Sequence, residues 1–133
     1  MILVDSNVLL DVLTTDSRWL PWSARMLEQA SDRYRLVINP IIFAEVSQRF
    51  SRQADADVAL PPTVLLREPL PYDAAFLAGK AYLDYRRRGG QKTSPLPDFF
   101  IGAHATVAGY KLLTRDVQRY RTYFPDLPLI APD

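Results

Sequence analysis

Three short apolar segments, each running directly into a polar residue, constrain the fold of this chain most. They cover residues 2–4, 35–38 and 111–113, and a helical pattern follows each of them. Continuous apolar runs of this length are typical of strands buried on both faces of a parallel sheet. Strands that alternate with helices predict an α/β domain with a central, mainly parallel sheet and helices on both sides.

The helical segments follow from apolar spacing and from proline and glycine signals. Pro21 and Pro40 suit the first turn of a helix, Asn39 is a good N-cap, and Gly89-Gly90 ends a helix. The spacing predicts helices over residues 7–13, 21–30, 41–52, 72–88, 98–108 and 117–123. Residues 53–71 contain four prolines and predict a connector with an extended piece at 64–67. Residues 93–97 predict a rigid loop, and 129–130 a last strand.

Composition excludes several kinds of protein. The chain of 133 residues contains no cysteine, which excludes disulfides and thiolate metal sites. No apolar run approaches the roughly 20 residues that cross a bilayer, and the first residues lack the basic flank of a signal peptide. We therefore expect a single domain over residues 1–133, without a membrane segment and located in the cytoplasm.

Four acidic residues fall where ligands gather in such folds. Asp5 and Asp116 follow the first and third predicted strands, Asp98 opens a predicted helix, and Glu45 interrupts an apolar helical run. Ligands of open parallel sheets bind at the carboxyl ends of the strands. A carboxylate within an apolar run is costly unless a cation is near. The placement predicts that the four carboxylates converge on one site.

Converging carboxylates need a positive partner, because without one they raise one another's pKa values. Oxygen ligands favour Mg²⁺ or Mn²⁺ over zinc, and the chain has one histidine and no cysteine. One ion with ordered waters and two ions are both compatible with the sequence. Taken singly, Asp5, Asp98 and Asp116 are also explained as helix caps, and Glu45 as the partner of an arginine.

The charge balance fits a polyanion substrate if the acids gather. Net charge is +1, but 16 basic residues against the 11 other acids give +5 outside the predicted site. Thirteen of the basic residues are arginine. A basic surface around an acidic hole suits metal-assisted cutting of nucleic acid. A genome rich in GC explains the arginine bias equally well.

Four sequence blocks resemble the PIN domain family, specifically the VapC-like toxins of bacterial type II toxin–antitoxin systems. They are ILVDSNV at residues 2–8, NPIIFAEV at 39–46, LPDFFIGAHA at 96–105 and LLTRD at 112–116. The blocks stand in the family's order and span nearly the whole chain. Phe99-Phe100 departs from the family's usual small or aliphatic pair. The resemblance implies a PIN-like three-layer α/β/α fold, a metal-dependent endoribonuclease that cuts RNA, a cognate antitoxin and a homodimer.

The resemblance also implies roles for individual residues. Asp5, Asp98 and Asp116 would hold the metal, and Glu45 would orient or deprotonate the attacking water. Asn7 and Thr114 would support the site through hydrogen bonds around it.

Basic residues near the site are candidates for RNA binding, each beside a structural explanation. Arg86, Arg87 and Arg88 with Lys92 form a cluster, but cations at a helix end are also favoured by the helix dipole. Arg115, Arg119 and Arg121 flank Asp116 or form a solvated face.

Five other residues suggest mainly structural roles. Trp19 and Trp22 are interpreted as packing residues rather than base-stacking ones. His104 is interpreted as a core or supporting histidine, and Asp11 and Asp16 as surface or capping acids.

Two other functions compete with the nuclease. A non-catalytic PIN-like module that binds RNA or protein would not need to concentrate negative charge toward a polyanion. A haloacid-dehalogenase-like phosphatase needs a second Asp two residues after the first, and position 7 is Asn.

Overall fold

Residues 1–90 and 96–133 are described by the structure, a computed structural model. Five parallel strands form one sheet in the order β3-β2-β1-β4-β5. The strands are β1 (Ile2–Val4), β2 (Leu36–Ile38), β3 (Leu65–Arg67), β4 (Lys111–Leu113) and β5 (Leu129–Ile130). The expected α/β fold with a mainly parallel sheet is confirmed, and every pairing is parallel.

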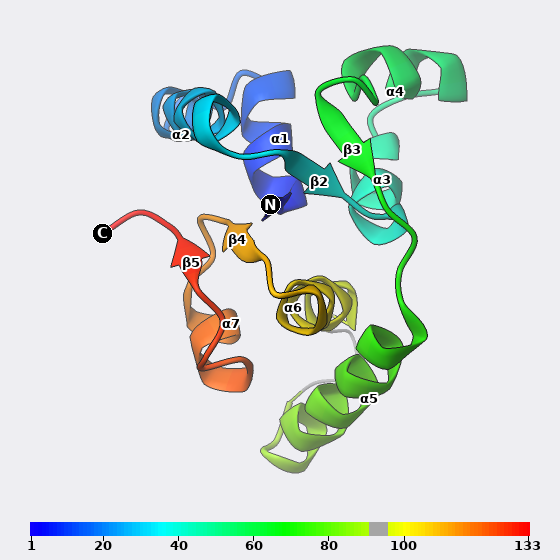
Figure 1. Ribbon diagram of the computed structural model, residues 1–133, viewed down its shortest axis with the longest axis vertical. Coiled ribbons are helices and arrows are strands. Elements are labelled where there is room, and N and C mark those ends of the chain that lie inside the picture. The colour runs from blue at the N-terminus through cyan, green and yellow to red at the C-terminus, as the bar shows by residue number, and fades with distance from the viewer. Residues whose placement is uncertain (91–95) are drawn as a thin grey trace.

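Seven helices in the described residues cover the two faces of the sheet. They are α1 (Ser6–Leu13), α2 (Leu20–Arg33), α3 (Pro40–Ser47), α4 (Gln53–Ala59), α5 (Tyr72–Arg87), α6 (Leu96–Ala108) and α7 (Gln118–Tyr123). Figure 1 shows α1, α2 and α4 on one side of the strands and α5, α6 and α7 on the other. The chain first adds strands outward from β1 to β3, then crosses back to β4. Right-handed crossovers therefore place the later helices on the opposite face.

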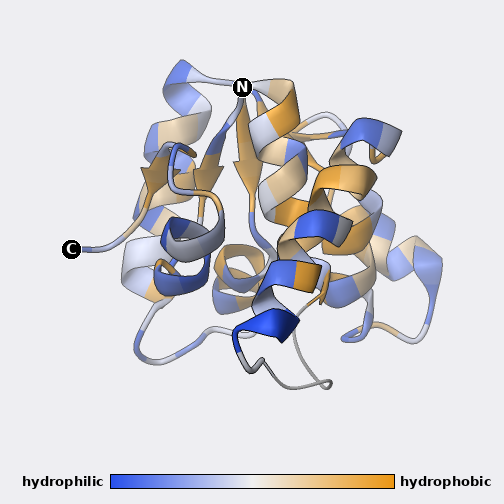
Figure 2. Ribbon diagram, turned by 90° about the horizontal axis from the view of Figure 1, so that it is seen from below, coloured by the Kyte–Doolittle hydropathy of each residue, from blue (hydrophilic) through white to orange (hydrophobic). Residues whose placement is uncertain are grey.

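The core is built from the strands themselves. Every residue of β1 and β2 is buried, as are Leu112 and Leu113 of β4. Figure 2 shows these apolar strands beside helices that carry both hydrophobic and hydrophilic residues. Burial on both faces explains why the strands are continuous apolar runs rather than alternating ones.

The predicted third helix, residues 41–52, is wrong in its second half. The structure has two helices there: α3 ends at Ser47, and α4 occupies residues expected to be a connector. The Ser47 hydroxyl donates to the Phe43 carbonyl at 2.6 Å, and the backbone N–H of Arg49 turns back to Val46. A side-chain bond of this kind competes with continuation of the helix. Only Ala56 of α4 is buried, so its apolar pattern was too short to detect.

Helix α6 begins two residues earlier than predicted. Asp98 therefore lies in its first turn rather than opening it, and positions 96 and 97 are helical rather than part of the predicted loop. Residues 93–95 of that loop lie outside the described residues, as does Lys92 of the basic cluster. The strand expected at 64–67 is present as β3, and α5 matches its predicted range to within one residue.

No helix in the described part of the chain is long and apolar enough to cross a membrane.

Candidate active site

The carboxyl ends of β1 and β4 position the centre of the candidate site. Asp5 directly follows β1 and Thr114 directly follows β4, and both side chains are buried. Because β1 and β4 are neighbouring parallel strands, their ends meet at one edge of the sheet. The Thr114 hydroxyl donates to Asp5 Oδ2 at 2.9 Å. Two residues 109 positions apart in the sequence are thereby joined.

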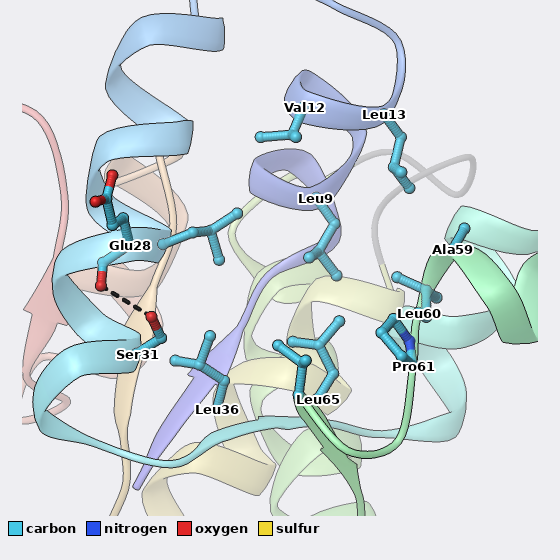
Figure 3. Close-up of a pocket in the computed structure, with 12 residues that line it drawn as sticks. Leu9, Val12, Leu13, Glu28, Ser31, Leu36, Ala59, Leu60, Pro61 and Leu65 are labelled. Atoms are coloured by element: carbon cyan, nitrogen blue, oxygen red, sulfur yellow. Dashed lines mark hydrogen bonds between the residues drawn. The ribbon is translucent and has the colours of Figure 1, made fainter.

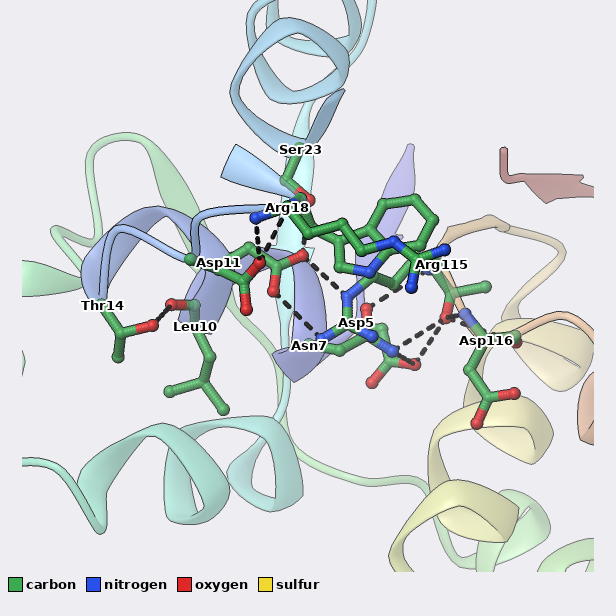
Figure 4. A network of polar contacts seen from close by, with 12 residues as sticks. Asp5, Asn7, Leu10, Asp11, Thr14, Arg18, Ser23, Arg115 and Asp116 are labelled. Carbon is green, nitrogen blue, oxygen red and sulfur yellow. Dashed lines mark hydrogen bonds and ion pairs between the residues drawn. The ribbon is translucent and has the colours of Figure 1, made fainter. Parts of the chain in front are cut away.

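Asp5 is held by hydrogen bonds on both carboxylate oxygens. Oδ1 accepts from the backbone N–H of Ser6 at 2.8 Å, so Asp5 also caps α1. Oδ2 accepts from Thr114, from the Tyr120 hydroxyl at 2.9 Å and from Asn7 Nδ2 at 3.3 Å. Figure 4 shows Asp5 between Asn7 and Asp116. Asp5 does cap α1, as considered from the sequence, but only its Oδ1 takes part in the cap.

Glu45 and Asp98 reach the same region from helices α3 and α6. The Ser6 hydroxyl donates to Glu45 Oε1 at 2.9 Å, which ties α3 to the start of α1. Arg119 Nη1 of α7 contacts Asp98 Oδ2 at 2.6 Å. Glu45 therefore has a hydroxyl partner rather than the arginine considered from the sequence.

The charge of Asp98 links the four acids electrostatically. Burial raises the pKa of Asp5 to about 7, and the Asp98 carboxylate is the next largest cause. Burial also raises the pKa of Glu45, with Asp98 adding to it. Burial raises the pKa of Asp98 itself, against the lowering effect of Arg119, and Asp116 contributes to the rise. Each of the other three acids thus interacts with the charge of Asp98.

The donor set suits a hard cation, although its side chains are not gathered around one point. Among residues 1–90 and 96–133, no group of three or more Asp, Glu or His side chains is arranged to hold a metal ion. Arg119 occupies one oxygen of Asp98, and Asp116 is exposed. The four carboxylates supply only oxygen ligands, and burial together with neighbouring carboxylates raises the pKa values of Asp5, Glu45 and Asp98. By this chemistry the residues fit Mg²⁺ or Mn²⁺, and Arg119 would compete with an ion for Oδ2 of Asp98.

The two supporting residues expected from the sequence contact the site. Asn7 Nδ2 donates to Thr114 Oγ1 at 3.2 Å, and Asn7 Oδ1 accepts from the backbone N–H of Arg115 at 3.3 Å. Thr114 Oγ1 also accepts from the backbone N–H of Asp116 at 3.1 Å. These bonds fix the loop after β4 against the start of α1.

Sequence analysis missed Tyr120 and Ser6. Tyr120 is fully buried and donates directly to Asp5, and burial together with the nearby Asp5 and Asp98 charges raises its pKa well above the usual value. Tyr120 lies four positions after Asp116, in the first turn of α7, and that closeness in sequence could have marked it. Ser6 follows Asp5 directly, but its bond to Glu45 spans 39 positions and left no local signal.

The interpretation of Asp11 as a surface or capping acid is wrong. Its side chain is 2% exposed, accepts from Ser23 Oγ at 2.7 Å, and pairs with Arg115 through two bonds of 2.8 and 3.1 Å (Figure 4). The Arg115 guanidinium also lies over the Trp19 ring, which in turn packs edge-on against Trp22. Asp16 does act as a cap, accepting from the backbone N–H groups of Arg18 and Trp19.

The remaining basic candidates lie at the end of α5. Arg86, Arg87 and Arg88 are exposed, and Arg88 forms an ion pair with Asp84 at 3.1 Å. Their predicted role in RNA binding, like that of Arg115, stays a prediction.

His104 belongs to a different cluster, as expected for a core histidine. Its Nδ1 lies 3.0 Å from Asn39 Nδ2, and its Nε2 lies 3.5 Å from Glu68 Oε1. Asn39 Oδ1 accepts from the backbone N–H of Ile42, so the amide nitrogen faces the ring. The proton of the neutral imidazole therefore lies on Nε2, toward Glu68.

Comparison with known proteins identifies one family. The model of the PIN domain family matches residues 2–125. No curated protein matches the sequence.

Solved structures share the fold at low identity. VapBC2 of Rickettsia felis, solved with a promoter DNA fragment, is 18% identical with a TM-score of 0.75, covering 100% of both chains. VapBC-1 of nontypeable Haemophilus influenzae is 19% identical with a TM-score of 0.73, covering 98% of each chain. VapC20 of Mycobacterium tuberculosis, described as a toxin that cleaves the sarcin–ricin loop, is 15% identical with a TM-score of 0.63, covering 92% of this chain and 95% of that one.

Proposed function

Because this chain belongs to the PIN domain family, we propose that it is a metal-dependent endoribonuclease and the toxin of a toxin–antitoxin pair. The observation that carries the proposal is the effect of the Asp98 charge on Asp5 and Glu45, and of Asp116 on Asp98. Proteins tolerate such an excess of negative charge mainly where function requires it. Cleavage of the sarcin–ricin loop by the Mycobacterium tuberculosis toxin supports RNA as the substrate.

Asp5, Asp98 and Asp116 would hold Mg²⁺, with Mn²⁺ as the alternative. The bound ion would lower the pKa of a coordinated water and neutralise charge on the phosphate. Tyr120, Thr114 and Asn7 keep Asp5 in one orientation through the three bonds to its Oδ2. A carboxylate held in this way needs little reorganisation when the cation binds.

Glu45 would accept the proton of the attacking water. Its Oε1 accepts the Ser6 hydroxyl, and no hydrogen bond from a described side chain reaches its Oε2. Burial raises the pKa of Glu45, which makes it a stronger base than a free glutamate. The water oxygen would attack phosphorus, the bond from phosphorus to the 3′ oxygen would break, and that oxygen would take up a proton, so the products would carry a 5′-phosphate and a 3′-hydroxyl.

RNA cleavage with a chelator control tests the activity. We expect cutting in Mg²⁺ or Mn²⁺, none in EDTA, and none from Asp98→Asn. Ends with 2′,3′-cyclic phosphate would contradict the mechanism, because they require the RNA 2′-hydroxyl as nucleophile. RNA binding without cutting in either metal would favour the non-catalytic module.

An apolar groove offers a surface for the antitoxin. Its volume is about 270 Å³, and its lining includes Leu9 and Leu13 of α1, Leu27 of α2 and Leu60 and Val64 near α4. Figure 3 shows this groove between the helices and the amino ends of β2 and β3. Several structural neighbours were solved as toxin–antitoxin complexes, which supports a protein partner. We expect the pair to act in the cytoplasm, where RNA is made.

Co-expression with the product of an adjacent small gene tests this partnership. Val64 is 56% exposed and lines the groove, whereas Val58 is 79% exposed and does not. Val64→Glu should weaken the complex, and Val58→Glu should leave it intact. Equal affinity of both variants would remove the groove from the interface.

The homodimer stays a prediction. Tyr72, Phe76 and Leu83 are exposed and share one face of α5, which makes that face a candidate contact. Sedimentation of wild type and Phe76→Glu would test it: a dimer that persists in the variant excludes the α5 face.

A further inference from the structure

A second cavity adjoins the acids, between α5 and α7. Its volume is about 370 Å³, and it is lined by Tyr85, Asp116, Gln118, Arg119, Thr122 and Tyr123. Pockets for small organic ligands begin at roughly 300 Å³. Asp116 and Arg119 belong to both regions, since Arg119 reaches Asp98 at 2.6 Å. A ligand in this cavity would therefore lie next to the acids, where the proposed function places the phosphate that is cut.

The two aromatic rings that line the cavity are held in position before any ligand binds. The Tyr85 and Tyr123 rings lie 5.9 Å apart at an interplanar angle of 70°. Phe99, which is fully buried, packs against both, with centroid distances of 5.5 Å to Tyr85 and 5.2 Å to Tyr123. Rings held by a buried neighbour lose little freedom when a planar ligand packs against them. The bulky Phe99, which departs from the family pattern, thus supports the walls of this cavity.

Cations stand at the aromatic walls. The Arg119 guanidinium lies 5.8 Å from the centre of the Tyr85 ring, and that of Arg88 lies 5.3 Å from the centre of the Tyr123 ring. Arg86 and Arg87 are exposed at the end of the same helix as Tyr85. Aromatic rings combined with arginines are the usual means of binding single-stranded nucleic acid.

The rim of the cavity carries groups that can distinguish one base from another. Gln118 and Thr122 are exposed and lie one helical turn apart. The Thr122 hydroxyl donates to the Gln118 carbonyl at 2.8 Å, which leaves its oxygen as an acceptor. The Gln118 amide supplies a donor and an acceptor. Both are needed to hydrogen-bond the edge of a nucleobase.

We propose that this cavity binds the unpaired nucleotide next to the bond that is cut. The base would lie against Tyr123 and Tyr85 with its edge toward Gln118 and Thr122, and Arg119 and Arg88 would contact its phosphates. The proposal rests on the nuclease function and adds that the substrate is single-stranded at this position. It also gives Arg119 a second partner, a phosphate, when Asp98 binds the metal.

The first test compares base preference among variants. RNAs with one randomised position on each side of the cut would be cleaved by wild type, Gln118→Ala and Thr122→Val. The matched control is Gln29→Ala, an exposed glutamine on α2. A base edge held by two hydrogen bonds is discriminated by roughly tenfold. We expect Gln118→Ala to lose about that much preference at one position only, and the control to lose none. Unchanged preference in both cavity variants would overturn the proposal.

Tyr123 gives a second comparison that separates the ring from its hydroxyl. Tyr123→Phe keeps the packing against Phe99, whereas Tyr123→Leu removes the stacking surface. We expect KM for a short RNA to rise by roughly tenfold in Tyr123→Leu and to stay near wild type in Tyr123→Phe. A KM unchanged in the leucine variant, at equal thermal stability, would contradict the assignment.

A binding measurement that needs no cleavage tests the nucleotide site independently of the proposed nuclease activity. The four ribonucleoside 5′-monophosphates would be titrated in EDTA while backbone amide signals are followed by NMR. Shifts at residues 85–88 and 118–123 would support the nucleotide site even if wild type cuts no RNA. Shifts that are absent or lie elsewhere would overturn it. Loss of antitoxin binding in Gln118→Ala, without a change in base preference, would instead assign the cavity to the protein partner.

Discussion

Two polar clusters lie at the carboxyl edge of the same sheet, and they differ in how well their charges are balanced. The first surrounds Asp5 after β1, with Asp98, Glu45 and Asp116 nearby. The second surrounds Glu68 after β3, with Asn39, His104 and Tyr110. There a single carboxylate accepts the Tyr110 hydroxyl at 2.8 Å and faces the His104 N–H at 3.5 Å.

The second cluster has the character of a structural site. His104 and Asn39 are 1% and 2% exposed, and both His104 nitrogens have partners. Burial lowers the pKa of His104, against the opposing effect of Glu68, so the ring stays neutral. In the first cluster, burial and mutual repulsion raise three carboxyl pKa values. At the same edge of the sheet, the polar groups around Glu68 have hydrogen-bond partners. The negative charges of Asp5 and its neighbours, in contrast, still need a cation.

The largest expected effect that would sharpen this contrast is the loss of cleavage in Asp5→Asn. Asparagine keeps the cap of α1, because it is as good an N-cap as aspartate. It removes the charge that binds the cation. Loss of a group that only orients a ligand costs about 10–100-fold, so loss of the ligand charge should cost at least about 1,000-fold. Single-turnover RNA cleavage measures it. Activity within tenfold of wild type would place Asp5 outside the mechanism.

Wild type should lose stability as pH rises through neutrality in EDTA, and Asp5→Asn should lack this pH-dependent loss. Asp5 has its pKa raised from 3.8 to about 7 in the folded state. The folded state therefore binds this proton more tightly, and the associated stability, present in full below pH 4, is lost as pH rises through 7. At about 1.4 kcal/mol per pKa unit, the loss reaches up to about 4 kcal/mol. Urea unfolding from pH 4 to pH 8 measures it.

Magnesium provides the control for this pH dependence. The ion should raise the free energy of unfolding of wild type at pH 8 and leave that of Asp5→Asn nearly unchanged. Equal stabilisation of both proteins would mean that the ion binds elsewhere. A wild type that gains stability between pH 4 and pH 7 in EDTA would show that Asp5 is already compensated, and the contrast between the clusters would fail.

His104→Leu should show the opposite behaviour, with a loss of stability and no gain. The variant leaves the Asn39 amide and Glu68 without their buried partner. An unsatisfied buried polar group costs about 1–3 kcal/mol. We expect that loss at pH 8, where His104 is neutral, together with normal cleavage per folded molecule. Unfolding midpoints and RNA cleavage at 20 °C below the midpoint would measure both. A large loss of activity in fully folded protein would make the second cluster functional.

Residues at the ends of strands could be predicted from the sequence, whereas most contacts between distant parts of the chain could not. Asp5 and Thr114 were predictable because each follows a buried apolar run, and parallel neighbours end at the same edge. Asp98 was identified as an acid of the site, but not its partner Arg119 or its place within the first turn of α6. The pairing of Asp11 with Arg115 spans 104 positions, and no local pattern reveals such a contact.

Local competition explains the errors in the fold. The sequence around Ser47 reads as one long helix, and a single side-chain bond to the backbone helps to end it. Helix α4 buries Ala56 and is followed by Leu60, one turn of apolar spacing, which is too little to distinguish a helix from a connector. The longer α5 repeats its buried alanines at positions 74, 78 and 81, and its limits were predicted closely.

The smallest expected effect concerns Arg119, the only cation paired with the first cluster among the described residues. Its side chain is 28% exposed and that of Asp98 is 23% exposed, so the pair contributes about 1 kcal/mol. Because Arg119 and a metal ion compete for Asp98, Arg119→Gln should raise the affinity for Mn²⁺ in RNA-free protein by about fivefold. The same variant should lose a little thermal stability in EDTA. Arg121→Gln, an exposed arginine of the same helix, is the matched control for net charge and should leave both quantities unchanged. Calorimetric titration with Mn²⁺ measures the difference. A lower affinity in Arg119→Gln would mean that the arginine helps to assemble the cation site, and the acids would then be partly balanced, as Glu68 is.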